Sequence, residues 1–403
     1  MNLFLDFTDK HITNIKIIIS GSKSESNRLL VLQQFFNDLR LENLSDSDDT
    51  KHLQEALSSN NKIIDIGHAG TAMRFLTAYF SVKEGSEIIL TGSERMQNRP
   101  IEILVEALQS LGADIQYLNK SGFPPLEIKG KNLISNKVRI QGNVSSQYIS
   151  ALLLIAPSLQ NGLEIELLGD ITSIPYIKMT LVLLDEIGVS YSWGDNIIKI
   201  APLKSIKPNT IVVESDWSSA SYFYSLVALS EEGTSLSLLS YKKGSLQGDS
   251  SLVDIYKHFG VATKFNNGMI TLSKIHIEPK PLSLNLVNYP DIAQTIAVTC
   301  LGLGVACDLT GLHTLKIKET DRLVALKNEL EKLGAQVNIT DESLHLEQSD
   351  HINKNIAIDT YNDHRMAMAF APLALKVPLT INDAEVVTKS FTSFWEVFES
   401  VFI

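Results

Sequence analysis

The sequence has little that would suggest disulfide chemistry or a metal centre. Cys300 and Cys307 are the only cysteines among 403 residues, and both lie in an apolar run. Two thiols cannot form a disulfide framework, and no His-Glu-x-x-His motif or cysteine pair has the spacing of zinc ligands. We therefore expect two buried thiols in a reducing cytoplasm, with a disulfide or a metal site as the less favoured alternative.

A signal peptide and a membrane segment are also missing from the pattern. The first 20 residues contain Asp6, Asp9 and Lys10, where a signal peptide would have an apolar stretch behind basic residues. The longest uncharged stretch, residues 140–163, is interrupted by glycine, asparagine, glutamine and Pro157, so it is a poor membrane span. The sequence predicts a cytoplasmic protein that does not enter a membrane.

Positive charge is scarce relative to negative charge. The formal net charge is −11, with 20% charged and 44% hydrophobic residues, as in ordinary globular proteins. This balance argues against nucleic acids and anionic membrane surfaces as partners, although a locally basic site can still bind small anions. No Walker A motif occurs, and Gly302-Leu303-Gly304 lacks the third glycine of a dinucleotide fingerprint.

One stretch stands out, Ile66-Gly67-His68-Ala69-Gly70-Thr71-Ala72-Met73-Arg74. It follows a strand-like run over residues 62–66 and opens a helix pattern, for which we expect Thr71 to be the cap. Glycine allows a ligand to approach the backbone closely, and a helix start attracts anions. Arg74 lies one turn further on, within reach of the same anion. A tight turn without a ligand is the structural alternative.

Similar turns recur along the chain, each a short polar segment before an apolar helix pattern. They cover residues 21–28, 67–74, 142–147, 214–220, 288–294 and 362–366. A second signature, a helix that ends at glycine and runs into a strand, recurs at intervals of roughly 74 residues, at Gly112, Gly188, Gly260 and Gly334. This spacing favours duplicated α/β units over chance. The best domain junctions lie near Ser20 and near Val213–Glu214.

Six cations lie at or near the expected helix starts, where the helix dipole opposes them. They are Lys23, Arg28, Arg74, Lys318, Arg322 and Arg365. A bound anion is the simplest compensation, since each charge-assisted hydrogen bond to it contributes roughly 1.5–3 kcal/mol. A solvated surface is the alternative for any one of them.

Three carboxylates accompany these cations, namely Asp291, Glu319 and Asp363. Each can act as a helix cap or as a general acid or base. Lys318-Glu319-Thr320-Asp321-Arg322 precedes a clear apolar stripe, and we expect Thr320 to be the N-cap. A charged first turn is the alternative interpretation of that segment.

Taken together, these motifs resemble the 5-enolpyruvylshikimate-3-phosphate synthase family, the 3-phosphoshikimate 1-carboxyvinyltransferases. The matching stretches run in family order across nearly the whole chain: residues 21–28, 69–74, 95–96, 99–100, 145–147, 216–223, 291, 318–322, 361–368 and 389–391. Each piece is unspecific alone, but the combination is highly specific.

The resemblance implies an α/β fold of two domains, an inside-out α/β barrel in which each domain has three βαβαββ-type units. Domain I would comprise residues 1–19 and 214–403, domain II residues 20–213, and the active site would lie in the interdomain cleft. The implied enzyme transfers the enolpyruvyl group of phosphoenolpyruvate to the 5-hydroxyl of shikimate 3-phosphate and releases phosphate. This is a step toward chorismate and the aromatic amino acids, inhibited by glyphosate, and the enzyme would be a monomer that needs no metal or organic cofactor.

The resemblance also implies roles for individual residues. The phosphoenolpyruvate ligands would be Lys23, Gly70, Arg99, Gln147, Arg322, Arg365 and Lys389. The shikimate 3-phosphate ligands would be Lys23, Ser24, Arg28, Ser145, Ser146, Gln147, Ser173, Tyr176, Asp291, Thr314 and Lys318. Asp291 would take the hydroxyl proton, Glu319 would deliver and remove the proton at the methylene carbon, and Lys23 would assist phosphate departure. Domain closure would exclude water.

Four positions depart from the family pattern, namely His68, Phe75, Trp217 and Thr314. We expect them to affect ligand geometry, and Phe75 to affect glyphosate sensitivity, without changing the reaction class.

Three rival functions stay open. The sister enzyme that acts on UDP-N-acetylglucosamine typically has a cysteine near the region of Ser93–Arg99, where this chain has none. An RNA 3′-phosphate cyclase of related architecture is disfavoured by the net charge. A noncatalytic descendant is disfavoured by the retained Asp291, Glu319 and Lys389.

Overall fold

The computed structural model describes residues 1–143 and 145–403, which divide into two compact units. Unit 1 comprises Met1–Ser20 and Glu214–Ile403, and unit 2 comprises Gly21–Val213. Val144, inside one of the expected polar turns, lies outside the described residues. Each unit has its own helices and sheets, and each is described separately below.

Unit 2 contains two copies of one βαβαββ pattern. The first consists of β4 (Ile63–Asp65), α3 (Gly70–Val82), β5 (Glu87–Thr91), α5 (Glu102–Ser110), β6 (Asp114–Tyr117) and β7 (Leu126–Lys129). The second consists of β8 (Lys137–Gln141), α6 (Ser146–Ile155), β9 (Leu163–Leu168), α7 (Ile174–Glu186), β10 (Tyr191–Gly194) and β11 (Ile197–Ile200). The sheet orders, β4-β5-β7-β6 and β8-β9-β11-β10, are equivalent, with one parallel pair and then an antiparallel hairpin.

The third group of unit 2 is shorter. It contains α1 (Lys23–Phe35), β3 (Leu39–Glu42), α2 (Asp48–Ser58) and β12 (Asn209–Val212), with β12 parallel to β3 and no hairpin in that two-stranded sheet. A short helix, α4 (Glu94–Gln97), precedes α5.

Unit 1 repeats the pattern. Its first copy is β2 (Lys16–Ile17), α8 (Trp217–Leu229), β13 (Ser235–Leu239), α9 (Leu252–Ile255), β14 (Val261–Asn266) and β15 (Met269–Lys274). Its second copy is β16 (Leu282–Asn285), α10 (Ala293–Leu303), β17 (Cys307–Thr310), α11 (Arg322–Lys332), β18 (Val337–Ile339) and β19 (Leu344–Leu346). The third group is again shorter, with β20 (Ile356–Ile358), α12 (His364–Phe370), β21 (Leu379–Ile381), the antiparallel β1 (Leu3–Leu5) and α13 (Phe394–Glu399).

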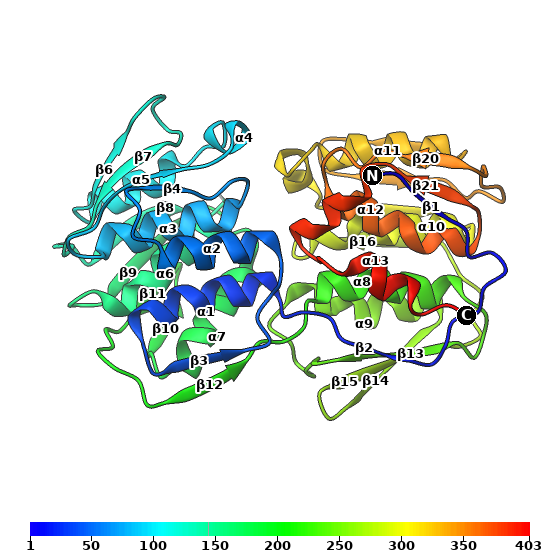
Figure 1. The fold of residues 1–403 in the computed structure, drawn as a ribbon, viewed down its shortest axis with the longest axis horizontal. Coiled ribbons are helices and arrows are strands. Elements are labelled where there is room, and N and C mark those ends of the chain that lie inside the picture. Colours follow the sequence, from blue (N-terminus) through cyan, green and yellow to red (C-terminus); the bar gives the residue numbers. More distant parts are fainter. Residues whose placement is uncertain (144) are drawn as a thin grey trace. The chain divides into compact units, whose positions relative to one another are not determined.

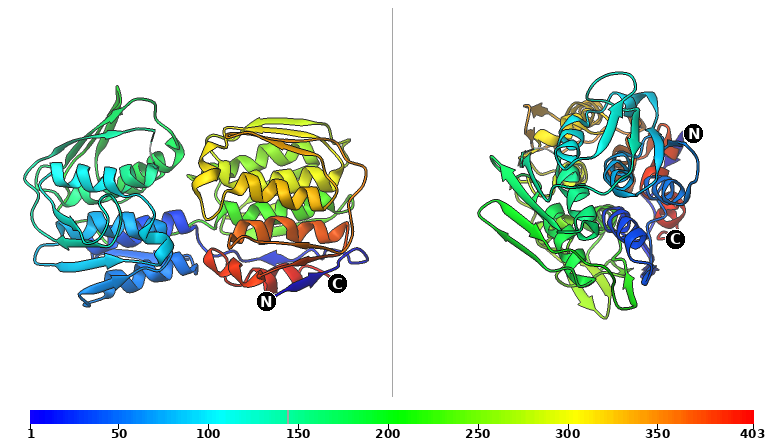
Figure 2. Two further views of the ribbon diagram at one scale, coloured as in Figure 1. Left: turned by 90° about the horizontal axis from the view of Figure 1, so that it is seen from above. Right: turned by 90° about the vertical axis from the view of Figure 1, so that its left-hand side faces the viewer.

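Helices fill the middle of each unit and sheets lie around them (Figures 1 and 2). In α8, all but one of the 13 residues are buried, and α10 and α6 are buried almost as completely. The strands instead alternate between buried and partly exposed residues, as in β9. A helix that is apolar all round must be enclosed, whereas an alternating strand covers a core with one face. This is the inside-out arrangement expected from the resemblance.

Glycine ends four of the helices as the sequence predicts. Gly112, Gly188, Gly260 and Gly334 have φ angles of 104°, 95°, 75° and 96°. These positive values lie in the region that other residues rarely adopt, so the repeated glycine marks a repeated C-cap.

Two helix starts differ from the prediction by one or two residues. Helix α3 begins at Gly70 with Ala69 as its N-cap, so Thr71 lies within the first turn and is not the cap. Helix α11 is capped by Asp321, whose carboxylate accepts from the amides of Leu323 and Val324, so Thr320 is not the cap. A carboxylate is an equally good N-cap and also favours the positive helix end.

No helix within the described part of the chain has the length and apolar character to cross a membrane. Cys300 and Cys307 are both buried, as the sequence predicts, and the structure shows no disulfide between them.

Candidate active site

In unit 2, the starts of α3 and α6 approach one another. The Gln147 amide nitrogen lies 3.2 Å from the Thr71 hydroxyl oxygen, which links the first turns of the two helices. Arg99 reaches the same place, because a Cβ atom built on Gly70 would lie 2.4 Å from its Nη1 atom. The absence of a side chain at Gly70 therefore makes room for the Arg99 guanidinium at the start of α3.

Arg74 lies directly beneath this point. Its side chain is buried and donates to the carbonyl oxygens of Gly70 and Pro100, each at 3.0 Å. Burial and the nearby charge of Arg99 lower the pKa of Arg74 to about 10. The positive charges of Arg74 and Arg99 repel one another, and Arg74 is buried, so an anion bound beside the two guanidinium groups would be stabilised.

Arg28 occupies a second buried position in unit 2. Its Nε atom donates to the Thr180 hydroxyl at 2.8 Å, and its Nη2 atom donates to the Ser150 hydroxyl at 3.0 Å. The guanidinium carbon lies 5.5 Å from the centre of the Phe75 ring and 5.9 Å from that of Tyr176. Burial lowers the pKa of Arg28 to about 10. The guanidinium is thus fixed by α6, α7 and α3 together.

The other expected unit 2 residues lie at helix starts. Lys23 is the first residue of α1, 3.4 Å from the Asp49 carboxylate, and Ser24 follows it. Ser145 caps α6 and Ser146 is its first residue, whereas Ser173 precedes α7 in a left-handed conformation with φ of 53°. We call Lys23, Ser24, Arg28, Gly70, Arg74, Arg99, Ser145, Ser146, Gln147, Ser173 and Tyr176 the unit 2 cluster.

In unit 1, Arg322 is the centre of a second cluster. Its Nε atom lies 2.6 Å from Asp363, its Nη1 atom 2.7 Å from Asp291 and its Nη2 atom 2.7 Å from Glu319. Burial acts to lower the pKa of Arg322, but the three carboxylates outweigh it and raise that pKa above its usual value. Because Arg322 begins α11 and Asp363 caps α12, this network joins two helix starts.

Asp291 lies where three cations meet. Besides Arg322, it contacts the Lys318 ammonium and the Arg365 Nη2 atom, each at 3.4 Å. It belongs to the 3₁₀ turn Pro290–Ile292, and neither that turn nor α10 has a side-chain cap. The sequence left open whether Asp291 is a cap; in the structure its side chain makes ion pairs instead.

The remaining expected residues of unit 1 lie near this network or beside its elements. Arg365 donates to the Asp291 carbonyl at 3.1 Å, and Lys389 donates to the Asn362 carbonyl at 2.6 Å. The Thr314 hydroxyl oxygen is buried and has no hydrogen-bond partner within the described residues. We call Asp291, Thr314, Lys318, Glu319, Arg322, Asp363, Arg365 and Lys389 the unit 1 cluster.

Comparison with known proteins decides the family of this chain. A family model described as EPSP synthase (3-phosphoshikimate 1-carboxyvinyltransferase) matches residues 54–398. The chain belongs to the EPSP synthase family. Curated relatives agree with this assignment. A 3-phosphoshikimate 1-carboxyvinyltransferase of Bacteroides fragilis is 46% identical over 384 residues, covering 94% of this chain and 93% of the relative. The enzyme of the same name from Haemophilus influenzae is 37% identical over 423 residues, covering 96% of each.

Solved structures support the same fold. EPSP synthase from Acinetobacter baumannii aligns with a TM-score of 0.82 at 20% identity, covering 99% of this chain and 98% of that one. The enolpyruvyl transferase NikO from Streptomyces tendae aligns with a TM-score of 0.75 at 13% identity, covering 99% and 97%. At these identities the likeness shows the fold alone, and it agrees with the expected two-domain enolpyruvyl transferase architecture.

Membership of the EPSP synthase family confirms the enzyme class expected from the sequence. The chain is a carboxyvinyltransferase of the shikimate pathway, with phosphoenolpyruvate and shikimate 3-phosphate as its substrates. The sister enzyme, the RNA cyclase and the noncatalytic descendant are therefore not needed to explain the motifs.

The sequence analysis did not predict several residues that contact the expected site residues or lie beside them. Asp49 was not singled out as a partner of Lys23, nor Ser150 and Thr180 as partners of Arg28. Asp249 was missed too, although its carboxylate is buried and accepts a hydrogen bond from Ser218. The one sequence feature that could have pointed to Asp249 is its position in a polar turn, directly after Gln247-Gly248.

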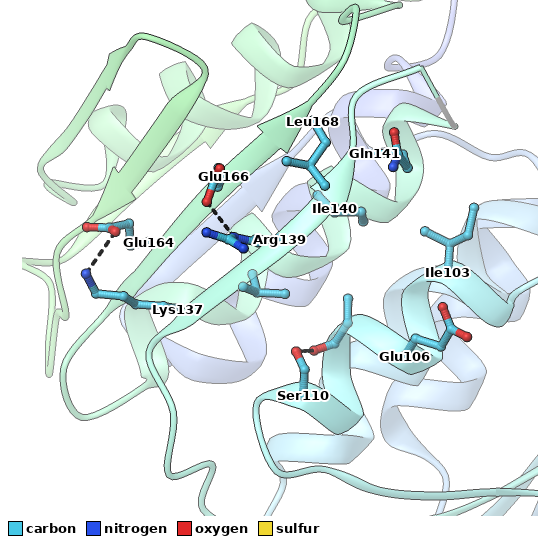
Figure 3. A pocket seen from close by; sticks show the side chains of 12 residues that line it. Ile103, Glu106, Ser110, Lys137, Arg139, Ile140, Gln141, Glu164, Glu166 and Leu168 are labelled. Atoms are coloured by element: carbon cyan, nitrogen blue, oxygen red, sulfur yellow. Dashed lines mark hydrogen bonds and ion pairs between the residues drawn. The ribbon is translucent and has the colours of Figure 1, made fainter.

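A large surface groove of unit 2 lies apart from these residues. It has a volume of about 720 Å³ and is lined by α5, β8 and β9, and the ion pairs Arg139–Glu166 and Lys137–Glu164 join the neighbouring strands β8 and β9 (Figure 3). None of the residues that the resemblance assigns to the substrates lines it.

Proposed function

We propose that the unit 1 cluster and the unit 2 cluster act together on one phosphoenolpyruvate and one shikimate 3-phosphate. The observation that carries this proposal is the convergence on Arg322 of Asp291, Glu319 and Asp363, with Arg365 and Lys318 against Asp291. Such a site offers both cations for anionic substrates and carboxylates for proton transfer. That the active site lies between domains I and II stays a prediction.

Phosphoenolpyruvate would be held by guanidinium groups and helix starts. In unit 2 its ligands would be Lys23, Gly70, Arg99 and Gln147, and in unit 1 they would be Arg322, Arg365 and Lys389. The position of the Arg99 guanidinium over Gly70, at the positive end of α3, supports this assignment. Planar guanidinium groups suit carboxylate and phosphate because they donate two parallel hydrogen bonds.

Shikimate 3-phosphate would be held mainly by hydroxyl groups with a few cations. The proposed ligands are Lys23, Ser24, Arg28, Ser145, Ser146, Gln147, Ser173, Tyr176, Asp291, Thr314 and Lys318. Arg28 is already fixed by Thr180, Ser150 and two rings, so little conformational entropy is lost when it binds a phosphate. The Thr314 hydroxyl, which has no hydrogen-bond partner in the described part of the chain, would donate to a substrate oxygen.

The two proton transfers are assigned to different carboxylates. Asp291 would remove the proton of the 5-hydroxyl as its oxygen attacks phosphoenolpyruvate, and Glu319 would give a proton to the methylene carbon. The resulting tetrahedral intermediate would collapse when Glu319 takes a proton back and phosphate leaves, assisted by Lys23. Arg322 contacts both carboxylates at 2.7 Å, which fixes their spacing.

We further propose that the chain acts as a cytoplasmic monomer. Two buried thiols that are not joined by a disulfide suit a reducing compartment. The net charge of −11 supports small anions held locally over nucleic acid as the ligands.

The direct test is phosphate release from phosphoenolpyruvate with each of two acceptors. We expect release with shikimate 3-phosphate and none with UDP-N-acetylglucosamine. Asp291→Asn and Glu319→Gln should abolish release while phosphoenolpyruvate still binds. Release with the sugar nucleotide alone would overturn the proposed acceptor, and full activity in either variant would overturn the proposed roles.

A further inference from the structure

Asp249 is a buried carboxylate of unit 1 that the proposed reaction does not use. It lies in the 3₁₀ turn Gly248–Ser251, and only 5% of its surface is exposed. Its Oδ2 atom accepts a hydrogen bond from the Ser218 hydroxyl at the start of α8. Burying a charged carboxylate is energetically costly, so we expect a nearby hydrogen-bond donor or cation that stabilises its negative charge.

Ser218 connects this carboxylate to Arg365. The Arg365 Nη2 atom lies 3.3 Å from the Ser218 hydroxyl oxygen. A guanidinium can only donate, so Ser218 must accept from Arg365 and direct its own proton to Asp249. Hydrogen bonds arranged in such a chain polarise and strengthen one another. The chain Arg365–Ser218–Asp249 therefore restrains one arm of the guanidinium, whereas the Asp291 carbonyl restrains the other.

The turn that carries Asp249 is anchored independently of Arg365. The Gln247 amide accepts from the Trp217 backbone nitrogen at 2.9 Å and donates to the Ser215 carbonyl at 3.0 Å. The buried Glu214 accepts from the Trp217 ring nitrogen at 2.8 Å. Asp249 is thus fixed to the start of α8 whether or not Arg365 moves.

The charges around Asp249 come from three elements. Asp216 caps α8, Asp291 lies in the turn before α10, and Arg365 is in the first turn of α12. Burial, with Asp291 and Asp216, raises the pKa of Asp249 to about 6, although Arg365 and the Ser218 hydroxyl act against this rise. The group is therefore ionised at neutral pH and becomes protonated in mild acid.

We propose that Asp249 is a positioning residue that holds Arg365, through the Ser218 hydroxyl, in the orientation that binds phosphoenolpyruvate. The proposal rests on the proposed role of Arg365 as a phosphoenolpyruvate ligand. Asp249 itself touches neither substrate. Without this chain, the Nη2 atom of Arg365 keeps only its 3.4 Å contact with the Asp291 carboxylate, so the guanidinium is held less firmly and phosphoenolpyruvate must order it on binding.

The test is steady-state kinetics of the full chain with both substrates varied. The variants are Asp249→Asn, Ser218→Ala and the double variant, with Ser218→Thr to restore the hydroxyl. Asp254→Asn is the matched control, because it makes the same change at an exposed carboxylate that pairs with Lys257. Thermal unfolding of each variant separates a loss of positioning from a loss of folding.

We expect the KM for phosphoenolpyruvate to rise about tenfold in Asp249→Asn and in Ser218→Ala, with the KM for shikimate 3-phosphate unchanged. The double variant should be no worse than either single one, because both changes break the same chain. Ser218→Thr should restore the wild-type KM, and Asp254→Asn should match wild type. The ratio of wild-type to Asp249→Asn kcat/KM should grow as pH rises through about 6.

An unchanged KM for phosphoenolpyruvate in Asp249→Asn would overturn the proposal. So would a parallel rise of both KM values with a lower unfolding temperature, since that pattern indicates a purely structural role. An inactive wild-type enzyme would instead refute the proposed function, so the two failures are distinguishable.

Discussion

The guanidinium of Arg322 donates to the Asp291 carboxylate across 2.7 Å, and this ion pair ties the start of α11 to the turn before α10. The same guanidinium contacts Glu319 and Asp363. One buried cation thus orients both carboxylates to which proton transfers are assigned. In the proposed function, anionic substrates would compete with the Asp291 carboxylate for Arg365 and Lys318, which would couple substrate binding to proton transfer.

Replacing Arg322 should cost far more stability than replacing an exposed arginine. Arg322→Met leaves the fully buried Asp363 without its cation and removes the nearest of the three cations around Asp291, and we expect a loss of about 3–5 kcal/mol. Arg139→Met is the control, since its pair with Glu166 is 74% exposed on the arginine side and contributes about 1 kcal/mol or less. Thermal unfolding monitored by circular dichroism measures the stability of both variants. Equal decreases in unfolding temperature for Arg322→Met and Arg139→Met would contradict this prediction.

A side chain at Gly70 should weaken phosphoenolpyruvate binding. In Gly70→Ala the new Cβ would meet the Arg99 guanidinium at 2.4 Å, so the guanidinium must move. We expect the KM for phosphoenolpyruvate to rise about tenfold or more, and the KM for shikimate 3-phosphate to rise less. Gly194→Ala is the control, because no atom of the described residues lies within 4 Å of its Cβ position. A Gly70→Ala enzyme with wild-type kinetics would argue against Arg99 as a ligand.

Phe75 should matter for shikimate 3-phosphate through Arg28. The Arg28 guanidinium lies 5.5 Å from the centre of the Phe75 ring, a contact typically worth about 0.5–2 kcal/mol. Phe75→Leu should therefore raise the KM for shikimate 3-phosphate about fivefold, and the KM for phosphoenolpyruvate should rise less. Phe80→Leu makes the same buried change in the same helix, and its ring contacts Tyr79 and Lys83. If both variants change KM alike, the Arg28 contact is not the cause.

The stability of the protein should depend on pH through Asp249. Its pKa is raised from 3.8 to about 6 in the folded protein, so as pH rises the unfolded chain loses this proton at a lower pH than the folded protein does. The free energy of unfolding therefore decreases as pH rises from about 4 to about 6. Asp249→Asn lacks this term, and above pH 6 it should gain up to about 3 kcal/mol relative to wild type. The measurement is the difference in unfolding free energy between the two proteins at pH 4.5 and pH 7.5. A difference that does not change with pH would show that Asp249 titrates normally.

Much of the fold follows from local signals in the sequence. Glycines such as Gly188 and Gly334 end helices because few other residues adopt a positive φ there. The strand-like run at residues 62–66 forms β4, which spans Ile63–Asp65. The order of the motifs identified the family because so many short stretches had to match together.

Other features depend on contacts between residues far apart in the sequence. Arg28 meets Ser150 and Thr180, which lie 122 and 152 positions away, and no local pattern encodes such a meeting. The choice of Asp321 over Thr320 as cap reflects competition between two good N-caps. Asp249 was missed because a single carboxylate in a polar turn resembles a solvated one until its burial is known.

The most direct test of the central claim is the reaction of phosphoenolpyruvate and shikimate 3-phosphate in heavy water, followed by proton NMR. If Glu319 exchanges protons at the methylene carbon, the wild-type enzyme should form the enolpyruvyl ether and place deuterium on its vinyl carbon. Glu319→Gln should do neither, while still binding both substrates. Deuterium incorporation at the wild-type rate in Glu319→Gln would contradict the assignment and place the proton transfer on another group.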